Sequence, residues 1–97
     1  MTTNSKVRVS LLSPEFILGT ASAMQVGVDK YAQGDYLNGD KLSKYYEKVQ
    51  RHVLAYWSGE DNDPESGLCH LYHAAADLNI MLEIIRKHPD RDDREKA

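Results

Sequence analysis

The side chains that could do chemistry in this chain are concentrated in residues 51–77. This segment holds three histidines, five carboxylates and one arginine. Imidazole and carboxylate groups are good ligands for divalent metals, and a guanidinium group binds phosphate through a planar fork of donors. A linker between helices does not need so many titratable groups. The segment therefore predicts a metal site or a phosphate site.

One predicted helix carries His70, His73 and Asp77 at positions i, i+3 and i+7. This spacing places the three side chains on one face, where they are candidate metal ligands together with Glu60 and Asp61. The alternative is a polar helix face whose histidines hydrogen-bond to their neighbours, and the spacing alone does not decide between them. A structural zinc site is not expected, because the single cysteine points away from this row and no second Cys/His pair exists.

Four carboxylates crowd the turn that precedes this helix. We interpret Asp63 as a helix cap and Glu65 as a favourable charge in the first turn. Glu60 and Asp61 are interpreted as functional, because residues 58–59 present them at the junction of two helices. Asp61 is the candidate catalytic carboxylate.

Arg51 and His52 are neighbours and therefore point in different directions. If His52 faces inward, Arg51 borders the same groove and can bind a phosphate, while His52 orients water or phosphate as a second catalytic candidate. The alternative is a surface arginine beside a hydrogen-bonded core histidine. Lys30, Tyr36 and Trp57 could add positive charge and stacking planes for a nucleotide base.

Three helices are predicted to position these residues, and no convincing strand is present. The pattern Ser13-Pro14-Glu15 is typical of a helix start, and this helix should run to about Tyr31. Asp40 is expected to cap a second helix that ends at residues 58–59. The third helix is expected to start at residues 63–65 and to end at residues 87–89, where cations favour the negative helix end.

The third helix has two faces that are not simply solvated. One carries the row of His70, His73 and Asp77, and the other is an apolar stripe formed by Leu68, Leu71, Ala75, Leu78, Leu82 and Ile85. We expect one face to pack within the protomer and the other to face a site, a second subunit or both. Tyr31 and Tyr45 are expected to belong to the core.

The length and composition set the class of protein. The chain has 97 residues and a net charge of -3, which argues against adhesion to nucleic acid. One all-α domain is predicted over residues 1–97, with 1–9 and 90–97 flexible and the second and third helices forming an antiparallel hairpin. So short a chain has a modest core, so a homo-oligomer is expected. No apolar run could span a membrane and no signal peptide is evident, so the expected location is the cytoplasm.

The segment Gly59-Glu60-Asp61-x-Asp63-Pro64-Glu65-Ser66-Gly67-Leu68-x-His70-Leu71-x-His73 resembles the phage-associated family of dATP/dGTP diphosphohydrolase N-terminal domains. The resemblance covers residues 8–85. It implies a compact helical protein related to the all-α, MazG-like nucleoside triphosphate pyrophosphohydrolases. Those enzymes release a monophosphate and pyrophosphate, using magnesium or manganese held by carboxylates. The resemblance therefore implies a purine nucleotide as ligand and, for a phage-encoded protein, the host cytoplasm.

Two departures leave two functions open. The related enzymes use Glu-x-x-Glu and Glu-x-x-Asp pairs, where this chain has Arg51-His52 and His70-x-x-His73, and the family's Asn-Trp is here Asp35-Tyr36. The first function is a Mg²⁺- or Mn²⁺-dependent pyrophosphohydrolase. The second is a sponge without a metal, which would sequester a nucleotide immune signal, such as a cyclic nucleotide or an ADP-ribose derivative, and so block antiphage defence.

Overall fold

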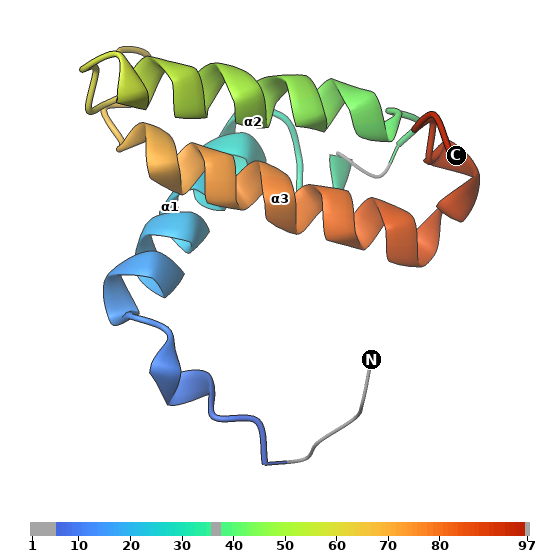
Figure 1. Ribbon diagram of the computed structural model, residues 1–97, viewed down its shortest axis with the longest axis horizontal. Coiled ribbons are helices and arrows are strands. Elements are labelled where there is room, and N and C mark those ends of the chain that lie inside the picture. Colours follow the sequence, from blue (N-terminus) through green and yellow to red (C-terminus); the bar gives the residue numbers. More distant parts are fainter. Residues whose placement is uncertain (1–5, 36–37, 97) are drawn as a thin grey trace.

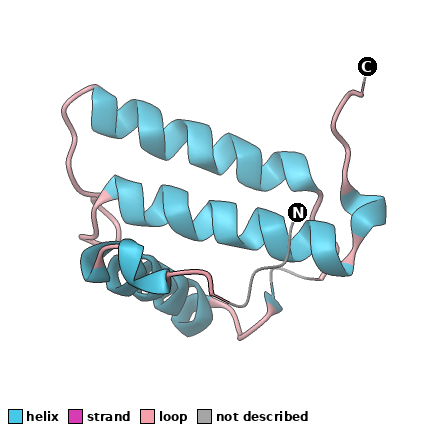
Figure 2. Cartoon of the chain, turned by 60° about the horizontal axis from the view of Figure 1, so that its bottom comes forward, coloured by secondary structure: helices cyan, strands magenta, loops and turns pink. Residues whose placement is uncertain are grey.

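Three α-helices make up the fold in the computed structural model, which describes residues 6–35 and 38–96. The helices are α1 (Pro14–Lys30), α2 (Leu42–Trp57) and α3 (His70–Lys87), with 3-10 turns η1 (Val9–Leu11) and η3 (Pro89–Arg91) at the two ends. Within the described ranges there is no strand (Figure 2). One isolated antiparallel bridge there joins Asn62 to Cys69. The all-α prediction is confirmed.

Helix α1 begins as its sequence predicts. The Ser13 side chain accepts a hydrogen bond from the Phe16 backbone N–H at 3.0 Å, and Pro14 occupies the first turn. Further along, Gly19 lies against the Tyr72 ring of α3, and a Cβ atom at this position would overlap the ring. A glycine is therefore required for α1 to pack this closely against α3.

Helix α2 does not use the predicted cap. Its N-cap is Lys41, which makes no side-chain capping bond, so the prediction for Asp40 is wrong. The Asp40 carboxylate instead accepts hydrogen bonds from Lys44 Nζ at 3.0 Å and from the Tyr45 hydroxyl at 3.1 Å. Lys44 and Tyr45, in the first turn of α2, thus bind the Asp40 carboxylate that was expected to cap this helix.

Helix α3 starts at His70 and not at residues 63–65, which corrects a second prediction. Asp63 does accept capping bonds, from the backbone N–H groups of Glu65 at 2.8 Å and Ser66 at 3.1 Å. They close a single turn, because Gly67 follows with a positive φ of 77° that an α-helix cannot continue. The bridge between Asn62 and Cys69 then brings the chain to the start of α3.

Helices α2 and α3 run antiparallel side by side, as predicted, while α1 lies across them (Figure 1). Leu42 and Tyr45 of α2 pack against Ile80 and Ile84 of α3 to form the buried cluster, with Met24 of α1 at its edge. The expectation for Tyr45 is confirmed. Tyr31 is 66% exposed just beyond α1, so its predicted place in the core is wrong.

Of the two faces of α3, the one with the histidine row packs within the protomer. His70, Ala74, Asp77 and Ile84 are buried on it. The leucine stripe faces outward, with Leu71, Leu78 and Leu82 all exposed. Helices α1 and α2 therefore cover the polar face of α3 and leave an apolar one open.

The C-terminal segment, predicted to be flexible, contacts the start of α2. Both the backbone N–H and the hydroxyl of Ser43 donate hydrogen bonds to the Asp93 carboxylate. At the other end, residues 1–5 lie outside the described residues. None of the described helices is both long and apolar enough to cross a membrane.

Candidate functional site

A cavity of about 480 Å³ opens between the three helices. Helix α2 contributes Lys48, Arg51 and His52, and α3 contributes His73 and Asp77. Such volumes are common for small-molecule sites, which span about 300–1,000 Å³. His52, which was predicted to face inward, thus shares this cavity with His73 and Asp77, which were predicted to lie together on one face of α3.

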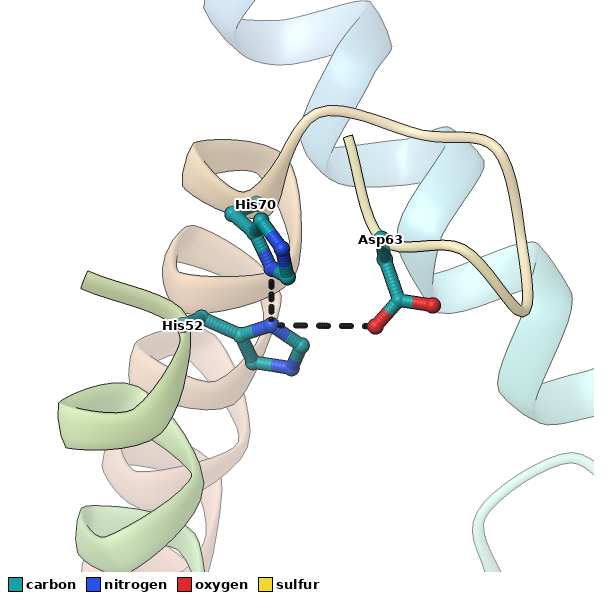
Figure 3. A group of neighbouring side chains, drawn as sticks. All are labelled: His52, Asp63 and His70. Carbon is teal, nitrogen blue, oxygen red and sulfur yellow. Dashed lines mark hydrogen bonds and ion pairs between the residues drawn. The ribbon is translucent and has the colours of Figure 1, made fainter. Parts of the chain in front are cut away.

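A chain of hydrogen bonds leads from His52 to the molecular surface. His52 Nδ1 lies 2.8 Å from His70 Nδ1 (Figure 3). His70 Nε2 lies in turn 2.6 Å from Glu60 Oε1. An ionised carboxylate only accepts, so His70 Nε2 carries the hydrogen. In a neutral His70 the Nδ1 atom is then the acceptor, and His52 Nδ1 donates to it.

His73 stacks on His52 and binds Ser66. The two rings are nearly parallel, at 14°, with centroids 4.9 Å apart. The Ser66 hydroxyl accepts a hydrogen bond from the Leu68 backbone N–H and lies 2.6 Å from His73 Nε2. A hydroxyl can accept two hydrogen bonds and donate one, so Ser66 pairs with His73 Nε2 whichever ring nitrogen carries the hydrogen.

Asp63 has a role beyond closing the turn. Its Oδ1 atom accepts both backbone hydrogen bonds of the turn, whereas Oδ2 lies 4.0 Å from His52 Nδ1. Burial pushes the pKa of Asp63 upward, but the Ser66 and Glu65 N–H groups outweigh it and hold the pKa below its usual value. Asp63 therefore offers an ionised oxygen to the histidines.

Burial dominates the electrostatics of the other groups. It raises the pKa of Asp77 to about 6, against the opposing charges of Lys48 and Arg51. Burial also lowers the pKa of His52 and of His73, with the neighbouring histidines acting in the same direction. The stacked histidines are therefore neutral near pH 7, so they act as hydrogen-bonding groups or metal ligands rather than as cations.

Positive charge in the cavity comes from lysine and arginine. Lys30 forms a 2.9 Å salt bridge with Glu65, which ties the end of α1 to the loop. Among the described residues, neither Lys48 nor Arg51 forms a salt bridge to a carboxylate, although Lys48 lies over the Tyr45 ring. These two cations remain available to an anionic ligand.

Several predicted site residues lie away from the cavity. Trp57 is 87% exposed at the end of α2, and Tyr36 lies outside the described residues. Asp61 is exposed and contributes its backbone carbonyl, which accepts a hydrogen bond from the His70 N–H at 3.0 Å. Glu60 approaches the histidines only through His70. The roles of these four residues stay predictions.

The cavity is also lined by polar residues that sequence reasoning did not identify as site residues, among them Tyr31, Lys48, Asp63 and Ser66. Lys48 was detectable, because it lies one helical turn before His52 and shares its face. Asp63 was assigned to a cap only. Tyr31 and Ser66 reach the cavity through the tertiary placement of the ends of α1 and the loop, which no local pattern encodes.

The ligands that a magnesium site requires are poorly represented here. Magnesium prefers octahedral oxygen ligands from carboxylates, water and phosphates. Helices α2 and α3 direct two imidazoles at each other, and of the carboxylates that line the cavity Asp40 and Glu65 are held by lysines while Asp77 is buried with a raised pKa. The carboxylate cage that the sequence resemblance implied is not reproduced by this donor set.

Comparison with known proteins gives one family. The family model described as "dATP/dGTP diphosphohydrolase, N-terminal" matches residues 2–94. A "dATP/dGTP diphosphohydrolase" of Salmonella phage PMBT28 is 34% identical over 89 residues, which cover 92% of this chain and 30% of the relative. The chain thus spans less than a third of that relative's length. No solved structure matches significantly.

Proposed function

The chain belongs to the dATP/dGTP diphosphohydrolase N-terminal domain family, and we propose that it binds a purine nucleotide in the cavity between its three helices. The observation that carries the proposal is the pair Lys48 and Arg51, which line the cavity beside His52 and form no salt bridge within residues 6–35 and 38–96. Phosphates are the part of a nucleotide that such a pair recognises.

The remainder of the cavity suits the base and sugar. Tyr31 is exposed at the cavity and offers a stacking plane, and Lys30 lies 5.5 Å from its ring centre. Met24 and Ile80 supply apolar lining. We assign the phosphates to the α2 side of the cavity and the base to the side near the end of α1.

The direct test is calorimetric titration with dATP and dGTP. Arg51→Ala removes a charge-assisted pair of hydrogen bonds and should weaken binding by about tenfold to a hundredfold. Arg51→Lys keeps the positive charge and loses the planar fork of donors, so its affinity should lie between those of the wild type and of Arg51→Ala. Arg86→Ala is the matched control, because Arg86 lies at the far end of α3 and pairs with Glu83. Equal binding by wild type and Arg51→Ala would remove the phosphate assignment.

Hydrolysis is the first candidate activity, and the relative's name supports it. Water would attack the α-phosphate of a purine deoxynucleoside triphosphate, giving the monophosphate and pyrophosphate. Incubation with dATP or dGTP plus Mn²⁺ or Mg²⁺ tests this, with the monophosphate as readout. Asp61→Ala and His52→Ala should each slow turnover, and an unchanged rate would exclude that residue from the reaction.

Sequestration without cleavage is the second candidate, favoured by the engaged state of the carboxylates. Glu65 pairs with Lys30, and Asp40 with Lys44, so the rim has few free anions for magnesium. A panel including cyclic dinucleotides and ADP-ribose derivatives can be mixed with the protein, which is then heat-denatured. Intact ligand in the supernatant, retained until denaturation and without added metal, supports a sponge. Converted ligand supports an enzyme.

A further inference from the structure

We propose that His52 Nδ1, His70 Nδ1 and Asp63 Oδ2 bind one divalent transition-metal ion of the imidazole-preferring kind, with Zn²⁺ as the reference ion. The three residues come from α2, α3 and the connecting loop, and Figure 3 shows their side chains converging. One ligand atom from each lies within 4.8 Å of the other two. Zinc bonds to nitrogen and oxygen are about 2.0–2.2 Å long, so small side-chain rotations bring all three atoms to one ion.

The contact between the two imidazoles supports this assignment. The Nδ1 atoms face each other at 2.8 Å, and in the metal-free protein one hydrogen bridges them. When a metal ion binds, the hydrogen of His52 moves from Nδ1 to Nε2, and the Nδ1 lone pairs of both neutral rings then bond to the ion. Two histidines held ring to ring across a helix pair therefore already have the direction that shared ligation requires.

Asp63 is oriented by the backbone. The N–H groups of Glu65 and Ser66 both bind Oδ1, at 2.8 and 3.1 Å, and this fixes the plane of the carboxylate. The other oxygen, Oδ2, is the one that faces His52 at 4.0 Å. The loop thus holds Asp63 as a one-oxygen ligand, even though its cap does not start a helix.

The outer nitrogens of both rings face carboxylates. His70 Nε2 lies 2.6 Å from Glu60, and His52 Nε2 lies 4.0 Å from Asp77. Metal-ligating histidines almost always donate their second N–H to a carboxylate, carbonyl or water, which orients the ring and raises its basicity. Glu60 is thereby a positioning residue for His70, and not a ligand itself.

The donor set determines the class of ion. Two imidazoles and one carboxylate suit zinc or another transition metal, whereas magnesium requires oxygen ligands. Three protein ligands leave a coordination position open. His52 and Asp63 also line the cavity, so a phosphate there could approach the ion. Only this last step rests on the proposed function, because metal binding itself needs no nucleotide.

The experiment is calorimetric titration of chelator-treated protein with Zn²⁺ alone, and with Co²⁺ for its visible absorption spectrum. We expect one ion per chain, no competition from Mg²⁺, and at least tenfold weaker binding for His52→Gln and Asp63→Asn. Glu60→Gln should weaken binding by about tenfold or more. Asp63→Asn preserves an oxygen for the turn, and circular dichroism checks that each variant folds.

Two further variants make the test specific. His88→Gln removes a histidine that lies away from the site and should bind zinc like the wild type. Asp90→Asn makes the same change as Asp63→Asn at an exposed carboxylate after α3 and should also leave zinc affinity unchanged. The proposal is overturned if folded His52→Gln and Asp63→Asn bind Zn²⁺ normally, if Asp90→Asn alone loses it, or if the wild type binds none. A nucleotide titration in chelator tests the proposed function separately.

Discussion

Asp77 is a buried carboxyl group beside neutral histidines, and its ionisation lowers the stability of the fold. The residue is 8% exposed, and burial raises its pKa to about 6. Residues with strongly perturbed pKa values concentrate at functional sites, since the fold alone gains nothing from an isolated buried charge. Lys48, Arg51 and His52 are the charged or titratable groups of α2 that face it.

The first prediction at this scale is that Asp77→Asn stabilises the metal-free protein above pH 6. A folded pKa of about 6 against 3.8 means that folding disfavours the ionised carboxylate. The contribution of Asp77 to stability is therefore greatest below about pH 4, falls as the pH rises from about 4 to 6, and stays reduced above that. The difference corresponds to a penalty of about 3 kcal/mol at most, and we expect the variant to recover about 1–2 kcal/mol.

Urea unfolding at pH 5 and pH 8 measures this effect. Asp90→Asn removes an exposed carboxylate and serves as the control, with no expected change in pH dependence. If the wild type and Asp77→Asn lose stability equally between the two pH values, Asp77 is not the group responsible.

Helical periodicity predicted the inward-facing residues of the site and failed at its rim. It placed His52 on the inward face of α2 and grouped His70, His73 and Asp77 on one face of α3, because a 3.6-residue period fixes which side chains share a face. It did not decide which face of α3 packs within the protomer. It could not place Trp57, which is the last residue of α2 and is exposed there. Residues at helix ends depend on how the chain turns next, and this is a tertiary property.

The start of α3 shows the same limit at the scale of an element. The pattern Asp63-Pro64-Glu65 is a valid cap and first turn, and the capping bonds do form. Gly67, with its positive φ, ends that turn and delays α3 until His70. The loop therefore retains Asp63 and Ser66 beside the histidines. A continuous helix from residue 64 would have carried Ser66 along the helix axis instead.

A pair of glycine substitutions tests this account of the elements. Gly67→Ala places a side chain on a residue with φ of 77°, where no neighbouring atom blocks it, so the cost is backbone strain of about 1–2 kcal/mol. Gly27→Ala adds the same methyl group inside α1, also into open space, and should stabilise by about 0.5–1 kcal/mol.

Chemical denaturation of both variants shows whether each substitution raises or lowers the free energy of unfolding. Because the substitution is identical and neither site is crowded, opposite signs isolate the backbone conformation as the cause. Two destabilising results would mean that α1 is not helical at Gly27 in solution, and two stabilising results would mean that Gly67 does not adopt a positive φ.

At the scale of the whole molecule, the chain exposes more surface than a folded monomer of its mass. Its accessible area is 7373 Å², against about 5,600 Å² expected for 11.0 kDa. The excess exceeds the roughly 800 Å² that one partner buries in a standard interface. The leucine stripe of α3 contributes to it, with Leu78 at 50% and Leu82 at 72% exposed. A second copy of this chain is the occupant we expect on this stripe, giving a dimer or a tetramer.

Leu82→Glu should therefore dissociate the assembly. The substitution places a charge at the centre of an apolar contact, where it cannot stay hydrated, so association should weaken by at least tenfold. Leu11→Glu is the matched control, because Leu11 is equally exposed, at 73%, but lies in η1 and not on the α3 stripe. Light scattering across a concentration series measures the mass of each variant.

A wild type that is monomeric at micromolar concentration would exclude the assembly, and dissociation by Leu11→Glu alone would move the interface to the N-terminal segment. Dissociation by Leu82→Glu with the cavity still binding its ligand would show that the leucine face of α3 serves assembly and its histidine face serves the site.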